Sequence, residues 1–202
     1  FEVARILRSE NLTRRVIFLF SDGEEPGLLG AFDFANNDPL MASVESLVNL
    51  EARGSRGPAV FFESNQPNAD AVSVYGAAPR PIANSVMADV YALLSNSSDV
   101  TAMTRPGLDI VNVAILDGLE DYHTPQDNIA SQDLGSVQHI GDVALAVTRR
   151  FAQQADADQQ RRPPVQRRQA ALGVVGRDGV LAQRVAERGV GEENIGTQVG
   201  KR

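Results

Sequence analysis

The 202-residue sequence lacks cysteine and tryptophan, and only 5% of its residues are aromatic. Without cysteine, disulfides and thiolate metal sites are excluded, so a bound metal ion would depend on His, Asp and Glu side chains. No apolar run approaches the length of about 18 residues that a membrane-spanning helix needs. The net charge of −7 argues against a nucleic-acid-binding protein, which usually presents a basic face. These absences leave a globular protein, long enough for one domain with a sizeable core.

The sequence also has no initiator methionine and no visible signal peptide. It opens as "FEVARILRSE", in which Val3, Ile6 and Leu7 have helical spacing with charges between them. This pattern is typical of the inside of a helix rather than of a natural start. We therefore expect the chain to be an N-terminally truncated fragment.

Apolar runs and helical patterns alternate along the first three quarters of the chain. Apolar or alternating segments predict strands at 16–20, 44–52, 59–64 and 108–116. Helical spacing predicts helices at 28–37, 83–95 and 133–154. Strands that alternate with helices predict an α/β layer fold with a mainly parallel sheet.

The composition changes near residue 156. Residues 1–155 carry 10 basic and 20 acidic side chains, a net charge of −10, whereas residues 156–202 carry 9 and 6, a net charge of +3. The second segment has no aromatic residue and is rich in Arg, Gln, Gly and Val. We expect residues 1–155 to form the domain and 156–202 to be a basic linker or disordered tail that the fold does not need.

Acidic and imidazole side chains follow several of the predicted strands. Glu24 and Glu25 follow the first strand, Glu51 ends the second, and His123 follows the strand that ends at Leu116. In an open α/β sheet, ligands bind outside the carboxyl ends of the strands, and parallel strands bring these ends to one edge. Oxygen and nitrogen ligands gathered there suit zinc. One glutamate of the adjacent pair would then bind metal, while the other takes a proton from water.

Each of these residues also has a simpler interpretation. Adjacent glutamates are usually a solvated turn, Glu51 alone would be a surface acid, and His123 alone would be a structural or surface histidine. His139 lies one position from the apolar stripe of the last predicted helix. We expect it to be a residue on the face of that helix, or one that supports the site, rather than a metal ligand. Asp22 is expected to cap the glycine-rich turn.

The combination of "SDGEEPGLLGA", "VNLEARGSRG" and "YHTPQDN", in this order, is more specific than its parts. It resembles the zinc aminopeptidases of metallopeptidase family 28, over about residues 1–153. The resemblance implies a three-layer, phosphorylase/hydrolase-like zinc-peptidase fold with a mixed, mainly parallel central sheet.

The resemblance also implies a role for each candidate residue. Glu24 corresponds to the general base that activates water, and Glu25 to a ligand of one zinc ion. Glu51 stands where the family binds the other zinc, and His123 matches the late histidine ligand of the metal that Glu25 does not hold. Three further residues flank the histidine and are expected to support it or to shape its turn: Tyr122, Thr124 and Asp127.

The sequence departs from the family pattern upstream of Glu24. The family's two-zinc site also needs a His-x-Asp motif and a bridging Asp, and no histidine precedes Glu24 here. The resemblance therefore implies an aminopeptidase that acts on peptides with a free N-terminus, with an incomplete site in these 202 residues. It also implies a full-length protein that is exported or membrane-associated.

Two alternatives remain open. Relatives in receptors and membrane complexes keep the fold without catalysis. Glutaminyl cyclases use it with one zinc, but they normally carry a Trp-containing insertion after the glutamate pair, which is absent here.

Overall fold

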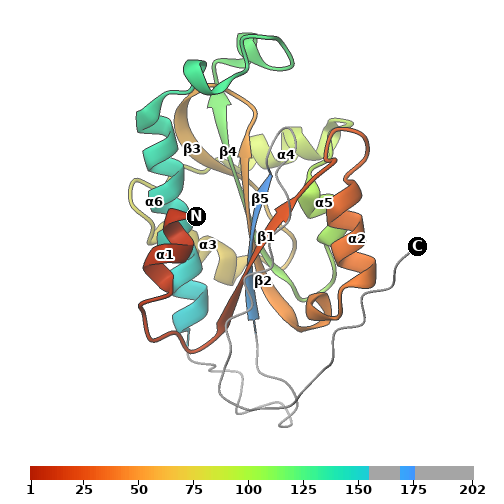
Figure 1. The fold of residues 1–202 in the computed structure, drawn as a ribbon, viewed down its shortest axis with the longest axis vertical. Coiled ribbons are helices and arrows are strands. Elements are labelled where there is room, and N and C mark those ends of the chain that lie inside the picture. The colour runs from red at the N-terminus through yellow and green to blue at the C-terminus, as the bar shows by residue number, and fades with distance from the viewer. Residues whose placement is uncertain (155–168, 176–202) are drawn as a thin grey trace, which may run out of the picture.

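The structure, a computed structural model, describes residues 1–154 and 169–175 (Figure 1). Its strands are β1 (Arg15–Ser21), β2 (Val44–Ala52), β3 (Arg56–Glu63), β4 (Asp109–Asp117) and β5 (Gln169–Val175). Its α-helices are α1 (Glu2–Leu7), α2 (Leu29–Asn37), α3 (Ala69–Gly76), α4 (Ser85–Leu93), α5 (Asp99–Met103) and α6 (Leu134–Gln153). Short 3₁₀ helices are η1 (Pro39–Ser43), η2 (Leu119–Asp121) and η3 (Ile129–Ser131).

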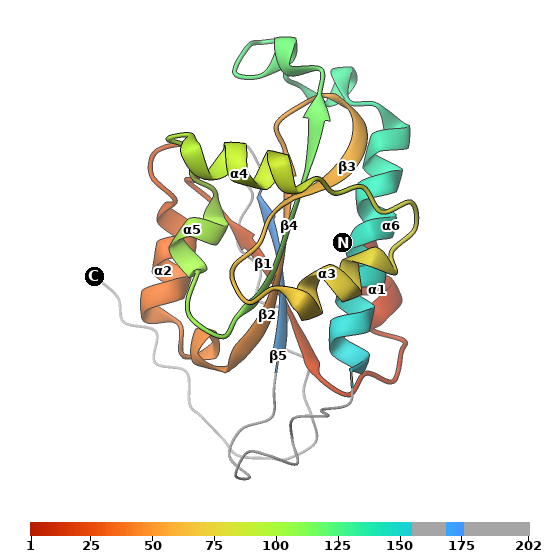
Figure 2. The ribbon, with the colours of Figure 1, turned by 180° about the vertical axis from the view of Figure 1, so that it is seen from behind.

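The strands form one five-stranded sheet in the order β1-β5-β2-β4-β3. All neighbours are parallel except β3, which pairs antiparallel with β4. Helices α1, α3 and α6 lie on one side of the sheet, and α2 and α5 lie on the other (Figures 1 and 2). The sequence-based expectation of a layered α/β fold with a mixed, mainly parallel sheet is confirmed.

The two faces of the sheet follow from the alternation of side chains along its central strands. Leu47 of β2 and Ile110 of β4 are register partners and belong to the core on the side of α2 and α5. Val48 and Val111, one residue further along, are also partners and belong to the core on the side of α3 and α6. All four are at most 1% exposed. Burial on both faces explains why apolar residues occupy successive positions in these strands, apart from a few polar interruptions such as Asn49 and Asn112.

The long helix α6 covers most of one face. It begins after Asp133, whose carboxylate accepts hydrogen bonds from the Ser136 backbone N–H (2.7 Å) and hydroxyl (3.0 Å), as an N-cap residue does. Val143, Val147 and Phe151 lie on its inner face and are fully buried. None of the described helices is long and apolar enough to cross a membrane.

Helix α4 differs from what its sequence predicts. The spacing of Val86, Val90 and Leu93 predicts an apolar face packed on the core, and the helix does form. However, these three residues are 63%, 50% and 85% exposed, and α4 buries no residue completely. Tyr91 instead faces inward and makes an edge contact with Phe62 of β3, with ring centroids 4.8 Å apart.

The prediction that 156–202 is a linker or disordered throughout is wrong for residues 169–175. These residues form β5, which lies between β1 and β2 and pairs in parallel with both. A composition averaged over the whole segment hides the short apolar run that this strand needs. A central strand also satisfies its backbone groups on both sides, which compensates for a lack of aromatic anchors. The other residues of 156–202 lie outside the described part of the chain.

Candidate metal and catalytic centre

The loop after β1 presents the two adjacent glutamates. Asp22 accepts a hydrogen bond from the Gly23 backbone N–H (2.8 Å), which is the capping role expected from the sequence. Gly23 has a positive φ of 70°, and a Cβ atom built on Gly30 would lie 2.8 Å from the Asp22 backbone. Because glycine alone allows both the left-handed turn and this close approach, the loop doubles back tightly on itself. Glu24 and Glu25 are held on this loop, directly beyond the carboxyl end of β1.

Glu25 meets His123, which lies 98 residues further along the chain. Glu25 Oε1 and His123 Nε2 are 2.7 Å apart, and both side chains are half exposed. His123 has a positive φ of 58°, a conformation that is uncommon outside glycine and that recurs at functional sites. Its ring stacks on Tyr122 with centroids 3.8 Å apart, and the Arg53 guanidinium lies 5.0 Å from the Tyr122 ring centroid. The loops after β1 and β4 are thus joined by a carboxylate and an imidazole.

The loop that carries His123 is anchored by its own polar contacts. The Thr124 hydroxyl donates to the Asp121 carbonyl (2.7 Å), and the Asp127 backbone N–H donates to the Thr124 carbonyl (3.0 Å). The Ser55 hydroxyl donates to the Asp121 carboxylate (2.6 Å) and so ties this loop to the turn between β2 and β3. Thr124 therefore shapes the turn, while Tyr122 supports the imidazole by stacking.

Glu51 lies deeper, at the end of β2. Burial raises the pKa of Glu51 to about 8, against a hydrogen bond from the Asn49 amide that lowers it. The neighbouring acids Glu24, Asp99 and Glu63 raise the pKa further by charge repulsion. A carboxyl group in this environment resists ionisation unless a cation lies nearby. Glu24 is therefore close enough to Glu51 for their charges to interact.

The structure brings the four candidate residues together only in part. Glu25 contacts His123, and Glu24 and Glu51 interact electrostatically. Within residues 1–154 and 169–175, no group of three or more His, Asp or Glu side chains is arranged to hold a metal ion. The donor set is chemically suited to zinc, since it combines carboxylate oxygens with an imidazole nitrogen.

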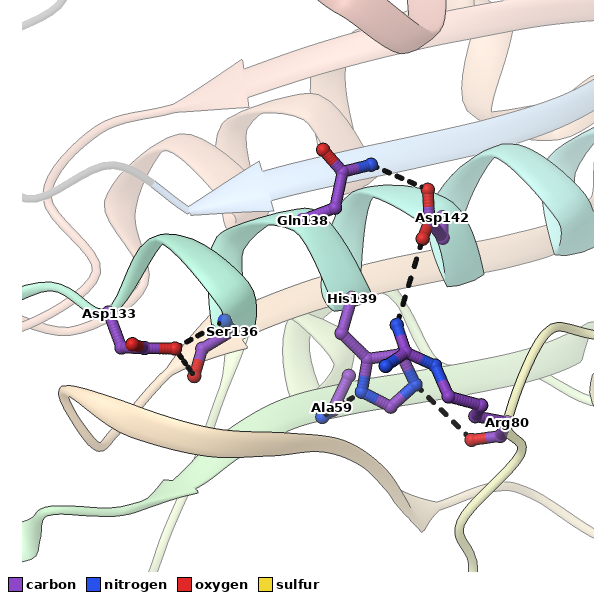
Figure 3. A network of polar contacts seen from close by, with 7 residues as sticks. All are labelled: Ala59, Arg80, Asp133, Ser136, Gln138, His139 and Asp142. Atoms are coloured by element: carbon purple, nitrogen blue, oxygen red, sulfur yellow. Dashed lines mark hydrogen bonds and ion pairs between the residues drawn. The ribbon is translucent and has the colours of Figure 1, made fainter.

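His139 is buried between α6 and β3, and its ring contacts Ala59 and Arg80 (Figure 3). Its Nδ1 accepts a hydrogen bond from the Ala59 backbone N–H (3.0 Å), and its Nε2 lies 3.2 Å from the Arg80 carbonyl oxygen. This pattern fixes the tautomer, with the proton on Nε2. Gln138 and Asp142 on the same helix contact each other (2.7 Å) at the surface. His139 thus links α6 to β3 and to the segment that carries Arg80, which is a structural role.

Sequence reasoning missed a set of buried polar residues beneath Glu51. Asn49, Asn112 and Asp99 are at most 2% exposed, and they lie on β2, β4 and the start of α5. The Ser21 hydroxyl at the end of β1 donates to the Asp99 carboxylate. A polar residue inside an apolar strand is the available signal, although sequence alone does not indicate which strands are neighbours.

Comparisons with known proteins identify the family. The model of peptidase family M28 matches residues 1–148. A vacuolar membrane protease from Yarrowia lipolytica is 30% identical over 162 residues, which cover 79% of this chain and 16% of that protein. Human endoplasmic reticulum metallopeptidase 1 is 31% identical over 160 residues, 75% of this chain and 17% of that protein. This chain thus spans about a sixth of the length of these relatives, and no solved structure matches it. The chain belongs to peptidase family M28.

Proposed function

We propose that this chain carries part of the catalytic centre of a zinc-dependent aminopeptidase. The contact between Glu25 Oε1 and His123 Nε2 at 2.7 Å is the observation that carries the proposal. A carboxylate and an imidazole that converge from separate loops are the pair that a zinc ion would use as ligands. When bound, zinc polarises the scissile carbonyl and makes water a better nucleophile at neutral pH.

The same contact supports a different pairing of metal ligands from the one that the resemblance implies, and we propose that pairing here. Glu25 and His123 were expected on different metal ions, but two side chains 2.7 Å apart favour a single shared ion. Glu51 would then face the second ion, which would relieve the cost of its buried charge. Glu24 remains the general base, because it is adjacent to a ligand and lies near Glu51. It takes a proton from water and returns it to the leaving amine.

The number of histidines limits what the 202 residues do alone. The chain has two, and His139 is held in a structural contact, so one imidazole is left for the site. We propose that the gene's full-length product supplies further ligands and that the 202-residue chain is inactive by itself. By analogy with the names of its relatives, we also propose that the full-length product works at or inside an internal membrane compartment.

The test compares variants of the full-length product by metal content and by hydrolysis of an aminoacyl anilide. Glu24→Gln should abolish turnover and keep the metal, because the amide has the same shape but cannot accept a proton. Glu25→Gln should lower metal content, since a neutral ligand replaces an anionic one. Glu120→Gln is the matched control, because this acid lies on the His123 loop but is exposed and paired with Arg56 (2.5 Å).

The outcomes separate the alternatives. Loss of metal in Glu24→Gln with retention in Glu25→Gln would show that the two roles are reversed. Hydrolysis of an N-acetylated anilide as fast as the free one would contradict the requirement for a free N-terminus. A full-length product with neither metal nor hydrolysis would favour a non-catalytic peptidase-like domain.

A further inference from the structure

Three polar side chains form a row across the middle of the sheet, beneath the candidate centre. The strand register pairs Asn49 of β2 with Asn112 of β4, and Asn112 with Glu63 of β3. Register partners point to the same face of a sheet, so the three side chains lie next to one another. Glu51, two residues beyond Asn49, shares this face. The row therefore begins beside a candidate metal ligand and runs across the sheet from β2 through β4 to β3.

Hydrogen bonds give this row a direction. Asn49 Nδ2 donates to Glu51 Oε1 (2.7 Å) and to Asn112 Oδ1 (3.0 Å). Asn112 Nδ2 in turn donates to Glu63 Oε2 (2.6 Å) and to the Ser98 hydroxyl (3.2 Å). Each amide thus has its N–H groups committed to two partners. Rotating the Asn49 amide by half a turn would place its oxygen against the Glu51 carboxylate, so the observed orientation is the favourable one.

The acceptor side of Asn49 shows what this arrangement favours. Asn49 is fully buried, and its Oδ1 has no hydrogen-bond partner in the described part of the chain. A buried amide that only filled the core would be expected to satisfy its oxygen as well. Here the cost of an unpaired acceptor is tolerated while both donors are used. The arrangement therefore holds the Glu51 carboxylate by a hydrogen bond, even though it leaves the Asn49 oxygen unpaired in the described residues.

The consequence for Glu51 is a fixed side chain. A glutamate at the end of a strand has several free torsions, and ordering them costs conformational entropy. The Asn49 hydrogen bond takes Glu51 Oε1, so a cation would meet the other carboxylate oxygen. Because Asn112 holds Asn49 in place, the geometry of the carboxylate is set by a chain of contacts that reaches β3.

We propose that Asn49 is a positioning residue that aims Glu51 at the metal, and that Asn112 sets the orientation of Asn49. The assignment rests on the proposed metal centre. If the amides served only to stabilise the core, their loss would lower stability without a specific effect on metal binding. Hydrogen-bonded partners of metal ligands usually change metal affinity by about 10-fold or more when they are removed.

The experiment uses the full-length product and measures Zn²⁺ affinity by competition with a chelator, beside the visible spectrum of the Co²⁺-loaded protein. Asn49→Leu should weaken Zn²⁺ binding about 10-fold or more and shift the Co²⁺ bands. Asn112→Leu should have a smaller effect in the same direction, because Asn49 keeps its own N–H bond to Glu51. Asn49→Ser serves if the leucine variant does not fold, since its hydroxyl is too short to reach Glu51.

Ser46→Ala is the matched control. Like Asn49, Ser46 lies on β2, is buried (1% exposed) and has an oxygen without a hydrogen-bond partner in the described residues. Unlike Asn49, it is an odd number of residues from Glu51, so its side chain faces the other side of the sheet. It should leave Zn²⁺ affinity unchanged. Unchanged affinity and Co²⁺ bands in the Asn49 variants would overturn the positioning role alone. A wild-type protein that binds no Zn²⁺ would instead overturn the proposed function and this inference with it.

Discussion

Strand β5 is expected to be essential to the fold, and two shortened chains test this. Removing residues 176–202 keeps β5, whereas ending the chain at Gln154 removes it. β5 forms seven register pairs with β1 and six with β2, and it is the strand that connects β1 to the rest of the described sheet. A backbone hydrogen bond contributes a net of about 0.5–1.5 kcal/mol. At the low end, and at roughly one bond per pair, the two ladders contribute about 6 kcal/mol.

This magnitude is comparable with the whole free energy of unfolding of a typical domain, about 5–15 kcal/mol. We therefore expect chain 1–154 to be unfolded, or to have lost the packing of β1 and of the Glu24–Glu25 loop, while chain 1–175 stays folded. Urea denaturation followed by circular dichroism measures the difference, and amide hydrogen exchange locates it in β1. Equal free energies of unfolding for the two chains, within about 1 kcal/mol, would refute the reasoning and restore the view that the segment is dispensable.

Three further perturbations have clear expected outcomes. His139→Leu leaves the buried Ala59 N–H without its acceptor and should lower the free energy of unfolding, measured by urea denaturation, by about 1–3 kcal/mol. Gln138 is exposed on the same helix, so Gln138→Leu should change this free energy by less than about 0.5 kcal/mol. Burial raises the pKa of Asp99, so the unfolded chain releases this proton at a lower pH than the folded chain does, and the folded state loses stability as pH rises. The Tm of Asp99→Asn minus the Tm of wild type should therefore increase between pH 3 and pH 7. A Tm difference that does not change with pH would contradict this. A Cβ on Gly54 would lie 2.0 Å from the Asp117 carbonyl oxygen, so Gly54→Ala should strongly lower the free energy of unfolding. A Cβ on Gly141 of α6 meets nothing within 4 Å, so Gly141→Ala should raise the free energy of unfolding by about 0.5–1 kcal/mol. A free energy of unfolding for Gly54→Ala as high as that for Gly141→Ala would show that the turn at Gly54 can move to accept a methyl group.

The sequence predicts the elements that depend on local patterns. The apolar run Val16–Phe20 and the helical spacing after Asp133 identify β1 and α6 to within a residue or two. The rule that parallel strands end at one edge also anticipates that the loops carrying Glu25 and His123 approach each other. These predictions succeed because hydrophobic periodicity and strand direction depend on residues that are close together in the sequence.

The features that sequence reasoning misses depend on which strands are neighbours. Asn49 and Asn112 look like polar interruptions of apolar strands, and only the register shows that they form one row. Residues 169–175 have a weak pattern of their own and become a strand because β1 and β2 offer backbone partners on both sides. Tertiary pairing of this kind overrides local propensity.

The position of β1 at the end of the sheet has a consequence for handling the protein. Its outer edge has no strand partner among the described residues, and its sequence Val16–Phe20 is entirely apolar. An edge strand of this kind can act as a template for a strand from another molecule, and charges or proline that would discourage this are absent from the run. The purified chain should therefore associate as its concentration rises, and sedimentation velocity across a dilution series would record that self-association.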